Sequence, residues 1–99
     1  KKEEDAFVIG DIVLSKGKRS CQVAGEEVEL TYKEFELLTL LMQNVGIVLT
    51  RDALMEKIWG IDFLGESRTL DVHIKTLRKK LGDAGKHIKT VRNVGYLLQ

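Results

Sequence analysis

The spacing of apolar residues changes at Thr31, which separates a strand-like first part of the chain from a helical remainder. Ahead of Thr31, short runs of β-branched and apolar residues are separated by glycines, a pattern typical of small strands joined by tight turns. The runs cover residues 7–9, 12–14, 21–23 and 28–30. We therefore predict a four-stranded antiparallel sheet in this part of the chain.

Two helices are predicted between Thr31 and Gly60. Thr31 and Glu34 have the spacing of a capping box, in which a hydroxyl and a carboxylate each accept a hydrogen bond from a backbone N–H at the helix start. Gly46 is suited to ending this helix, whose apolar positions are Phe35, Leu38, Leu41, Met42 and Val45. Thr50 caps a second helix that ends at Gly60. Its apolar positions are Leu54, Met55, Ile58 and Trp59.

A third helix is predicted from a cap at Ser67 to Leu81, with Gly82 as its stop. Residues 87–99 are then predicted to form a strand, a tight turn at 93–95 and a return strand. Three helices with short connections and a terminal hairpin match a helix-turn-helix core with a β-wing. We therefore expect an α+β fold of the winged helix-turn-helix type, with a four-stranded N-terminal sheet, three helices and a C-terminal β-hairpin wing.

The third helix has two different faces when its residues are placed at about 100° intervals. One face is a narrow apolar stripe of Leu70, Ile74, Leu77 and Leu81. The opposite face combines cations with short side chains: Arg68, Val72, Lys75, Thr76 and Lys79. A DNA-reading helix needs cations for phosphates and short side chains for base edges and thymine methyl groups. The alternative interpretation of this face is a solvated surface helix.

The charge is distributed unevenly, although the net charge is only +1. Residues 1–66 carry 8 Lys and Arg against 13 Asp and Glu, a net charge of −5, whereas residues 67–99 carry 8 against 2, a net charge of +6. Clustered cations favour polyanions because they release the counterions condensed on phosphates. We therefore expect any nucleic-acid surface to lie toward the C-terminus.

The length of 99 residues and the 43% hydrophobic content are those of one ordinary globular domain. We expect this domain to cover residues 7–99, with residues 1–6 as the end of an interdomain linker. No apolar stretch approaches the roughly 20 residues needed to span a bilayer, so a membrane protein is not expected. A single cysteine, Cys21, fits a cytoplasmic protein. His73 and His87 lack the neighbours of a catalytic or metal site, so we expect no enzyme and no cofactor.

Four segments of the chain together resemble the C-terminal winged-helix DNA-binding domain of OmpR/PhoB-type response regulators. They are residues 30–38, 49–60, 68–81 and 88–96. The resemblance implies that the third helix, residues 67–81, enters the major groove and that the wing, residues 87–98, reaches the adjacent minor groove. It also implies an N-terminal receiver domain, a cognate histidine kinase, and paired head-to-tail binding of otherwise monomeric domains at direct repeats.

The resemblance and the helix faces together give the candidate DNA-binding residues. These are Arg51, Arg68, Thr69, Val72, His73, Lys75, Thr76, Arg78, Lys79, Thr90, Arg92 and Tyr96. We expect Val72, Thr76 and Lys79 to contact bases and Arg92 to enter the minor groove. Phosphate contacts are expected from Arg68, Thr69, His73 and Lys75. The alternatives are a structural role for His73, an ion pair of Arg78 with Asp71 and a solvated Arg92. For Trp59 we expect a core position, with a phosphate contact of its indole N–H as the alternative.

An acidic loop at residues 60–66 offers a different kind of surface. In the family that the chain resembles, this loop approaches RNA polymerase, which makes the loop residues Asp62, Phe63, Leu64 and Glu66 candidate polymerase contacts. The alternative function is therefore a protein-interaction module that docks through this loop.

The chain departs from the family pattern at four positions. Asn93 replaces a usual glycine in the wing turn, and Val45 replaces a usual proline. Asn tolerates a positive φ better than most residues, so we expect the turn to survive. Thr76 stands where relatives often have arginine, and Leu97 where a cation is common. Sequence preference therefore cannot be copied from a relative.

Overall fold

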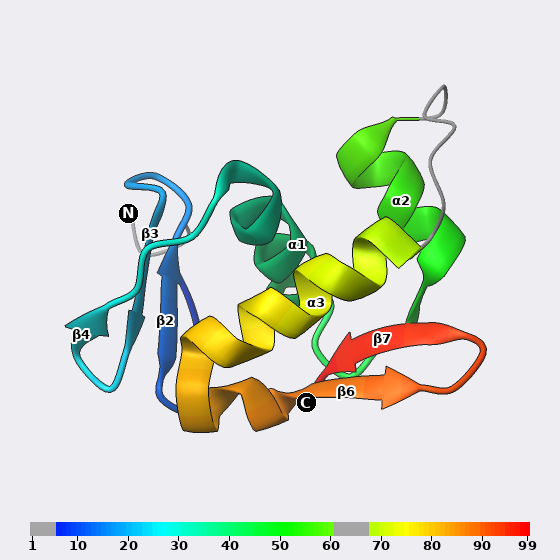
Figure 1. Cartoon of the computed structure of the whole chain (residues 1–99). Coiled ribbons are helices and arrows are strands. Elements are labelled where there is room, and N and C mark those ends of the chain that lie inside the picture. The colour runs from blue at the N-terminus through cyan, green and yellow to red at the C-terminus, as the bar shows by residue number, and fades with distance from the viewer. Residues whose placement is uncertain (1–5, 61–67) are drawn as a thin grey trace.

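The computed structural model describes residues 6–60 and 68–99. Two antiparallel sheets lie at opposite ends of the molecule, with helices between them (Figure 1). The N-terminal sheet has the order β1-β2-β3-β4. Its strands are β1 (Ala6–Ile9), β2 (Ile12–Ser15), β3 (Ser20–Val23) and β4 (Glu26–Glu27). The predicted four-stranded antiparallel sheet is therefore confirmed.

The fourth strand lies earlier than predicted. Ala24 and Gly25 both have positive φ angles, 54° and 85°, so they form a two-residue turn after which Glu26 pairs at once with Val23. Turns with two left-handed residues match the twist of a hairpin, but alanine is not among the residues that predict such a turn. Only one further backbone bond, from the Val28 N–H to the Cys21 carbonyl at 2.8 Å, extends the pairing. The prediction of a strand at residues 28–30 was wrong.

The first helix, α1 (Tyr32–Gln43), begins at the predicted capping box. The Thr31 hydroxyl accepts from the Glu34 N–H at 3.2 Å, and the Glu34 carboxylate accepts from the Thr31 N–H at 2.9 Å. The helix ends sooner than expected because the Asn44 side chain donates to the Leu40 carbonyl at 2.8 Å. Val45 therefore lies outside the helix and is 48% exposed, which corrects its predicted place on the buried face.

The other two helices have the predicted ends where the structure describes them. The helix α2 (Arg51–Trp59) is capped by the Thr50 hydroxyl, which accepts from the Ala53 N–H at 3.1 Å, and it ends at Gly60. The helix α3 (Arg68–Leu81) stops at Gly82, whose φ is +63°. Its predicted cap, Ser67, lies outside the described residues. A 3-10 helix, η2 (Gly82–His87), follows α3 and was not predicted.

The predicted hairpin consists of β6 (Ile88–Val91) and β7 (Gly95–Leu98). Asn93 adopts a φ of +65° in the turn between them, as expected. A short strand that was not predicted, β5 (Leu49–Thr50), pairs with β7 and gives the order β5-β7-β6. A Cβ atom at Gly95 would lie 2.0 Å from the Leu49 carbonyl oxygen, so only glycine permits this close approach.

One hydrophobic core joins these elements, and it takes in the whole apolar stripe of α3. Leu70, Ile74, Leu77 and Leu81 are at most 2% exposed. They pack with buried residues of the N-terminal sheet, of α1 and of β7, including Leu14, Leu38 and Leu98. The predicted polarity of α3 is confirmed. Cys21 is in the same core, and burial raises the pKa of its thiol to about 11, which leaves it protonated and unreactive.

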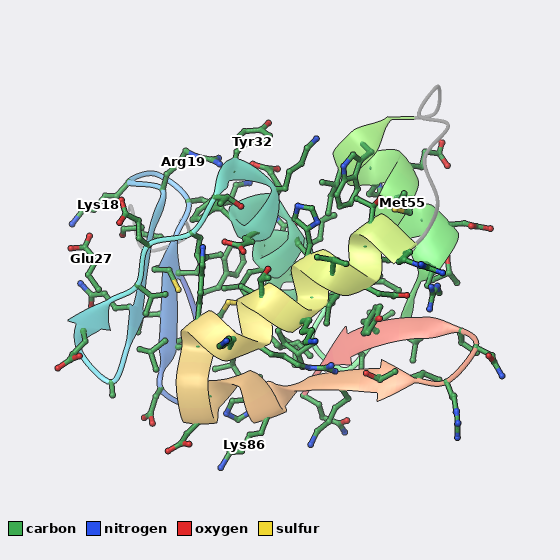
Figure 2. All side chains as sticks on the ribbon, viewed as in Figure 1. Lys18, Arg19, Glu27, Tyr32, Met55 and Lys86 are labelled. Carbon is green, nitrogen blue, oxygen red and sulfur yellow. The ribbon has the colours of Figure 1, made fainter. Side chains whose placement is uncertain are left out.

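Arg19 connects the N-terminal sheet to the start of α1, where Figure 2 shows it beside Tyr32. Its guanidinium carbon lies 4.3 Å from the centre of the Phe35 ring and 5.1 Å from that of Tyr32. The Nη1 atom also lies 2.9 Å from the Glu36 carboxylate. The ring contacts and the ion pair of Arg19 therefore hold the N-terminal sheet against the start of α1, where Glu34 lies.

Candidate nucleic-acid interface

The outward face of α3 carries exposed cations around a valine. Val72 is 52% exposed, and Arg68, Lys75 and Lys79 are exposed around it. Within residues 6–60 and 68–99, no hydrogen bond or ion pair holds the side chains of these three cations. Their charges are therefore available to a polyanion. Thr76 is exposed as well, but its hydroxyl donates a hydrogen bond to Glu34.

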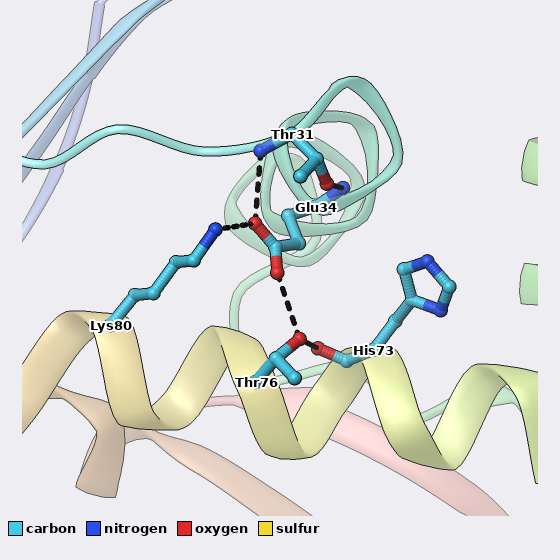
Figure 3. A network of polar contacts seen from close by, with 5 residues as sticks. All are labelled: Thr31, Glu34, His73, Thr76 and Lys80. Carbon is cyan, nitrogen blue, oxygen red and sulfur yellow. Dashed lines mark hydrogen bonds and ion pairs between the residues drawn. The ribbon is translucent and has the colours of Figure 1, made fainter.

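The flank of α3 that faces α1 is tied to one buried carboxylate (Figure 3). Glu34 Oε2 accepts from the Thr76 hydroxyl at 2.8 Å, and Oε1 lies 2.7 Å from the Lys80 ammonium. Oε1 also accepts the capping bond from the Thr31 N–H. Burial alone would raise the pKa of Glu34, but the bonds from Lys80, Thr31 and Thr76 and the charge of Lys80 outweigh burial and lower it to about 2. The carboxylate is therefore ionised and can only accept.

The opposite flank of α3 is tied to the hairpin and to the start of α2 through Asp71. One carboxylate oxygen lies 2.6 Å from Nη2 of Arg51, and the other accepts from the Tyr96 hydroxyl at 2.6 Å. Burial and the bond to Asp71 raise the pKa of Tyr96 to about 12, so the phenol keeps its proton. Tyr96 is only 6% exposed.

Arg78 binds the hairpin rather than Asp71. Its Nε and Nη2 atoms donate to the Ile88 carbonyl at 3.2 and 2.9 Å, and Nη2 also donates to the Thr90 hydroxyl at 2.7 Å. The considered pairing of Arg78 with Asp71 was wrong. Spacing within one helix does not reveal that β5 and β7 bring Arg51 and Tyr96 to Asp71.

Trp59 and His73 meet on the flank of α3 that carries Thr69 and Thr76. Their ring centroids are 5.0 Å apart at an interplanar angle of 79°, an edge-to-face contact. The Lys33 ammonium lies 5.2 Å from the centre of the indole and donates to the Ile58 carbonyl at 2.8 Å. Trp59 is half-buried and packs against the core, which agrees with the core interpretation of this residue.

The wing projects beyond the helices at the end of the molecule opposite the N-terminal sheet (Figure 1). Arg92 is exposed in the turn between β6 and β7, beside Asn93 and Val94. The Arg51 N–H donates to the Val94 carbonyl at 3.1 Å, so the wing turn is fixed to the start of α2. The position of Arg92 relative to α3 is thereby set by the fold.

Two functional elements of this surface were missed from the sequence. Glu34 has a visible signal only for its capping role, and Lys80 was not singled out at all. The contact between Glu34 of α1 and Lys80 of α3 depends on tertiary packing. The candidate polymerase contacts Asp62, Phe63, Leu64 and Glu66 lie outside the described residues. Among the residues that the structure does describe, no group of His, Cys, Asp or Glu is arranged to hold a metal ion.

A helix with a basic outward face, two preceding helices and a hairpin beside it define a winged-helix domain. Residues 25–98 match the family described as "Transcriptional regulatory protein, C terminal". The chain therefore belongs to this family: it is a C-terminal DNA-binding domain of the OmpR/PhoB response-regulator type, with a function in DNA binding and the control of transcription. Because this is a family of regulators, the expectation that the domain is not an enzyme is confirmed.

Solved structures of related proteins agree with this assignment. The response regulator DrrB of Thermotoga maritima is 32% identical with a TM-score of 0.88, over 96% of this chain and 44% of that one. The DNA-binding domain of Klebsiella pneumoniae RstA, in complex with the RstA box, is 36% identical with a TM-score of 0.83, over 94% and 95% of the two chains. The DNA-binding domain of Escherichia coli CpxR is 34% identical with a TM-score of 0.83, over 94% of each chain.

The chain spans less than half the length of DrrB but nearly all of the isolated RstA and CpxR domains. In the part of the chain that is described, none of the helices has the length and apolar content needed to cross a membrane.

Proposed function

We propose that this domain recognises specific double-stranded DNA sequences, with α3 in the major groove and the wing at the adjacent minor groove. The observation that carries the proposal is the outward face of α3, where exposed cations surround an exposed Val72. The flanks of the same helix are fixed by Glu34 and Asp71, so this face is held in one orientation. The complex of the related RstA domain with the RstA box supports DNA binding by this domain.

The proposed contacts divide the surface by chemistry. Val72, Thr76 and Lys79 contact base edges, and phosphate contacts come from Arg68, Thr69, His73 and Lys75. Arg51, Arg78 and Thr90 lie at the hairpin side of α3, where Arg78 retains its Nη1 amino group for a phosphate. The Tyr96 hydroxyl proton is committed to Asp71, so we assign Tyr96 to positioning this side of the helix.

We further propose the assembly that the resemblance implies. The domain is the output part of a cytoplasmic response regulator whose receiver domain is controlled by a histidine kinase. Two domains, monomeric when isolated, occupy direct repeats, and residues 60–66 contact RNA polymerase. The similarity to DrrB, which is longer than this chain, supports an output domain within a larger regulator.

Selection of bound sequences from a random duplex pool tests the proposal. We expect enrichment of one motif, and Val72→Ala should lose discrimination at one thymine position by about 1 kcal/mol.

Lys75→Ala should weaken binding to all duplexes and reduce the salt slope by about one unit, because it removes one phosphate contact. Absence of enrichment at low salt, together with a Phe63→Ala variant that abolishes a protein contact, would favour the protein-interaction module instead.

A further inference from the structure

Thr76 faces the proposed DNA-binding surface, yet its hydroxyl points back into the protein. Its Oγ1 atom lies 2.8 Å from Oε2 of Glu34, and Figure 3 shows this bond running from α3 toward the start of α1. Glu34 is 4% exposed, whereas Thr76 is exposed. One end of the hydrogen bond is therefore buried, and the other is at the surface that meets DNA.

The proton of this hydroxyl has no freedom to serve a base. A hydroxyl has one proton, and a carboxylate that is paired with Lys80 at 2.7 Å can only accept. The Thr76 hydroxyl also lies 3.1 Å from the His73 carbonyl, but the bond to the carboxylate is shorter and charge-assisted. The proton therefore stays on the side of Glu34, and the methyl group is left as the outward part of the side chain.

Glu34 is itself held firmly. Its carboxylate accepts the capping bond from the Thr31 N–H at 2.9 Å, so α1 fixes its position. Thr76 and Lys80 are one helical turn apart and bind the two oxygens of the same carboxylate. Rotation of α3 about its axis would break both bonds and leave a buried charge unpaired, which is unfavourable.

We propose that Glu34 is a specificity-determining positioning residue: it holds the Thr76 hydroxyl inward, so that Thr76 presents a methyl group, and not a hydrogen-bond donor, to a base pair. This inference rests on the proposed placement of α3 in the major groove. A methyl group makes an apolar contact with the thymine methyl, whereas a free hydroxyl proton can be donated to an acceptor of either pair, O6 or N7 of guanine included, and so does not discriminate between them. The Glu34–Thr76 bond therefore favours an A·T pair over a G·C pair at the position that Thr76 faces.

The test compares binding of single variants to duplexes that differ only at this base pair. The parent should prefer the A·T duplex by about fivefold or more, a typical cost of one mismatched pair. Thr76→Val, which keeps the shape and the methyl group, should retain this preference, and Thr76→Ser should lose it. Glu34→Gln keeps the capping spacing, but its amide can donate to the threonine oxygen and release the hydroxyl proton. It should therefore bind the G·C duplex nearly as well as the A·T duplex.

Two further variants separate positioning from general destabilisation. Lys80→Gln removes the other partner of Glu34 without touching the Thr76 hydroxyl, so its base preference should equal that of the parent. Combining Glu34→Gln with Thr76→Val should restore the preference for A·T, because no hydroxyl remains to be released. Thermal unfolding of each variant shows which of them fold. The comparison of Thr76→Val with Thr76→Ser tests the methyl contact without any change at Glu34.

The outcomes distinguish this inference from the function on which it rests. An unchanged preference in Glu34→Gln, or a shifted preference that persists in the double variant, would overturn the role of Glu34 while sequence-specific binding stands. Retention of the preference in Thr76→Ser would overturn the methyl contact. A parent that enriches no sequence would overturn the proposed function and this inference with it.

Discussion

His73 has a hydrogen bond that decides what its ring can offer to a phosphate. Its Nδ1 atom lies 2.8 Å from the Thr69 carbonyl oxygen, and a carbonyl can only accept, so Nδ1 carries a proton. In the neutral ring, Nε2 is then an acceptor and repels a phosphate oxygen. Only the doubly protonated ring can bind Thr69 and a phosphate at once.

A phosphate contact by His73 predicts a measurable salt effect. His73→Gln should weaken binding to all duplexes and reduce the salt slope by up to about one unit, because it removes one phosphate contact. The control is His87→Gln, because His87 binds the Gln99 carbonyl at the far end of η2. Equal salt dependence of the parent and His73→Gln would contradict a phosphate contact.

Arg92 is the second residue whose chemistry makes a sharp prediction. A narrow, A·T-rich minor groove concentrates negative potential, and a guanidinium enters it at a lower desolvation cost than an ammonium. The parent should prefer duplexes with A·T pairs beside the major-groove site, and Arg92→Lys should show this preference weakly. The measurement is binding to two duplexes that differ only in these flanking pairs. Arg92→Ala should bind both equally; an undiminished preference in this variant would mean a solvated turn residue.

At the scale of elements, the sequence predicted what depends on local patterns. The capping box at Thr31, the stop at Gly82 and the apolar stripe of α3 all rest on interactions within one helix or on its periodicity. The strands β4 and β5 are two residues long, too short for any periodicity to show. Likewise, the partners that join Asp71 and Glu34 to other elements lie 20 to 46 residues away in the chain, so only the packing of the elements reveals them.

The helix α3 should respond differently to changes on its two faces. Leu77 is fully buried, so Leu77→Ala should lower the free energy of unfolding by about 2 to 5 kcal/mol, through lost burial and a cavity. Val72→Ala, on the exposed face of the same helix, should change it by less than about 0.5 kcal/mol. Urea unfolding of both variants provides the comparison. A Leu77→Ala protein as stable as the parent would mean that the helix presents the other face to DNA.

At the scale of the whole molecule, α3 is held between two polar anchors that join distant parts of the chain. Glu34 connects it to α1 through Thr76 and Lys80, and Asp71 connects it to β7 and the start of α2. The Gly46 N–H also donates to the Leu98 carbonyl at 2.8 Å, so the end of α1 is tied to the hairpin. Polar bonds therefore hold the outward face of α3 and the wing together as one surface, and the orientation of α3 depends on the carboxylates of Glu34 and Asp71.

The Glu34 anchor predicts how the fold responds to acid. The pKa of Glu34 is lowered from 4.5 to about 2 in the folded domain, so its stabilising contribution is fully present above the unfolded pKa and is lost as the pH falls toward 2. This contribution is on the order of 3 kcal/mol. Glu34→Gln should therefore be less stable than the parent at pH 7, and the difference should shrink as the pH is lowered to about 2.5. Urea unfolding at a series of pH values measures it, and Glu36→Gln, whose half-exposed carboxylate pairs with Arg19, is the matched control. A constant difference between parent and Glu34→Gln across this range would mean that the charge of Glu34 does not hold α3 in place.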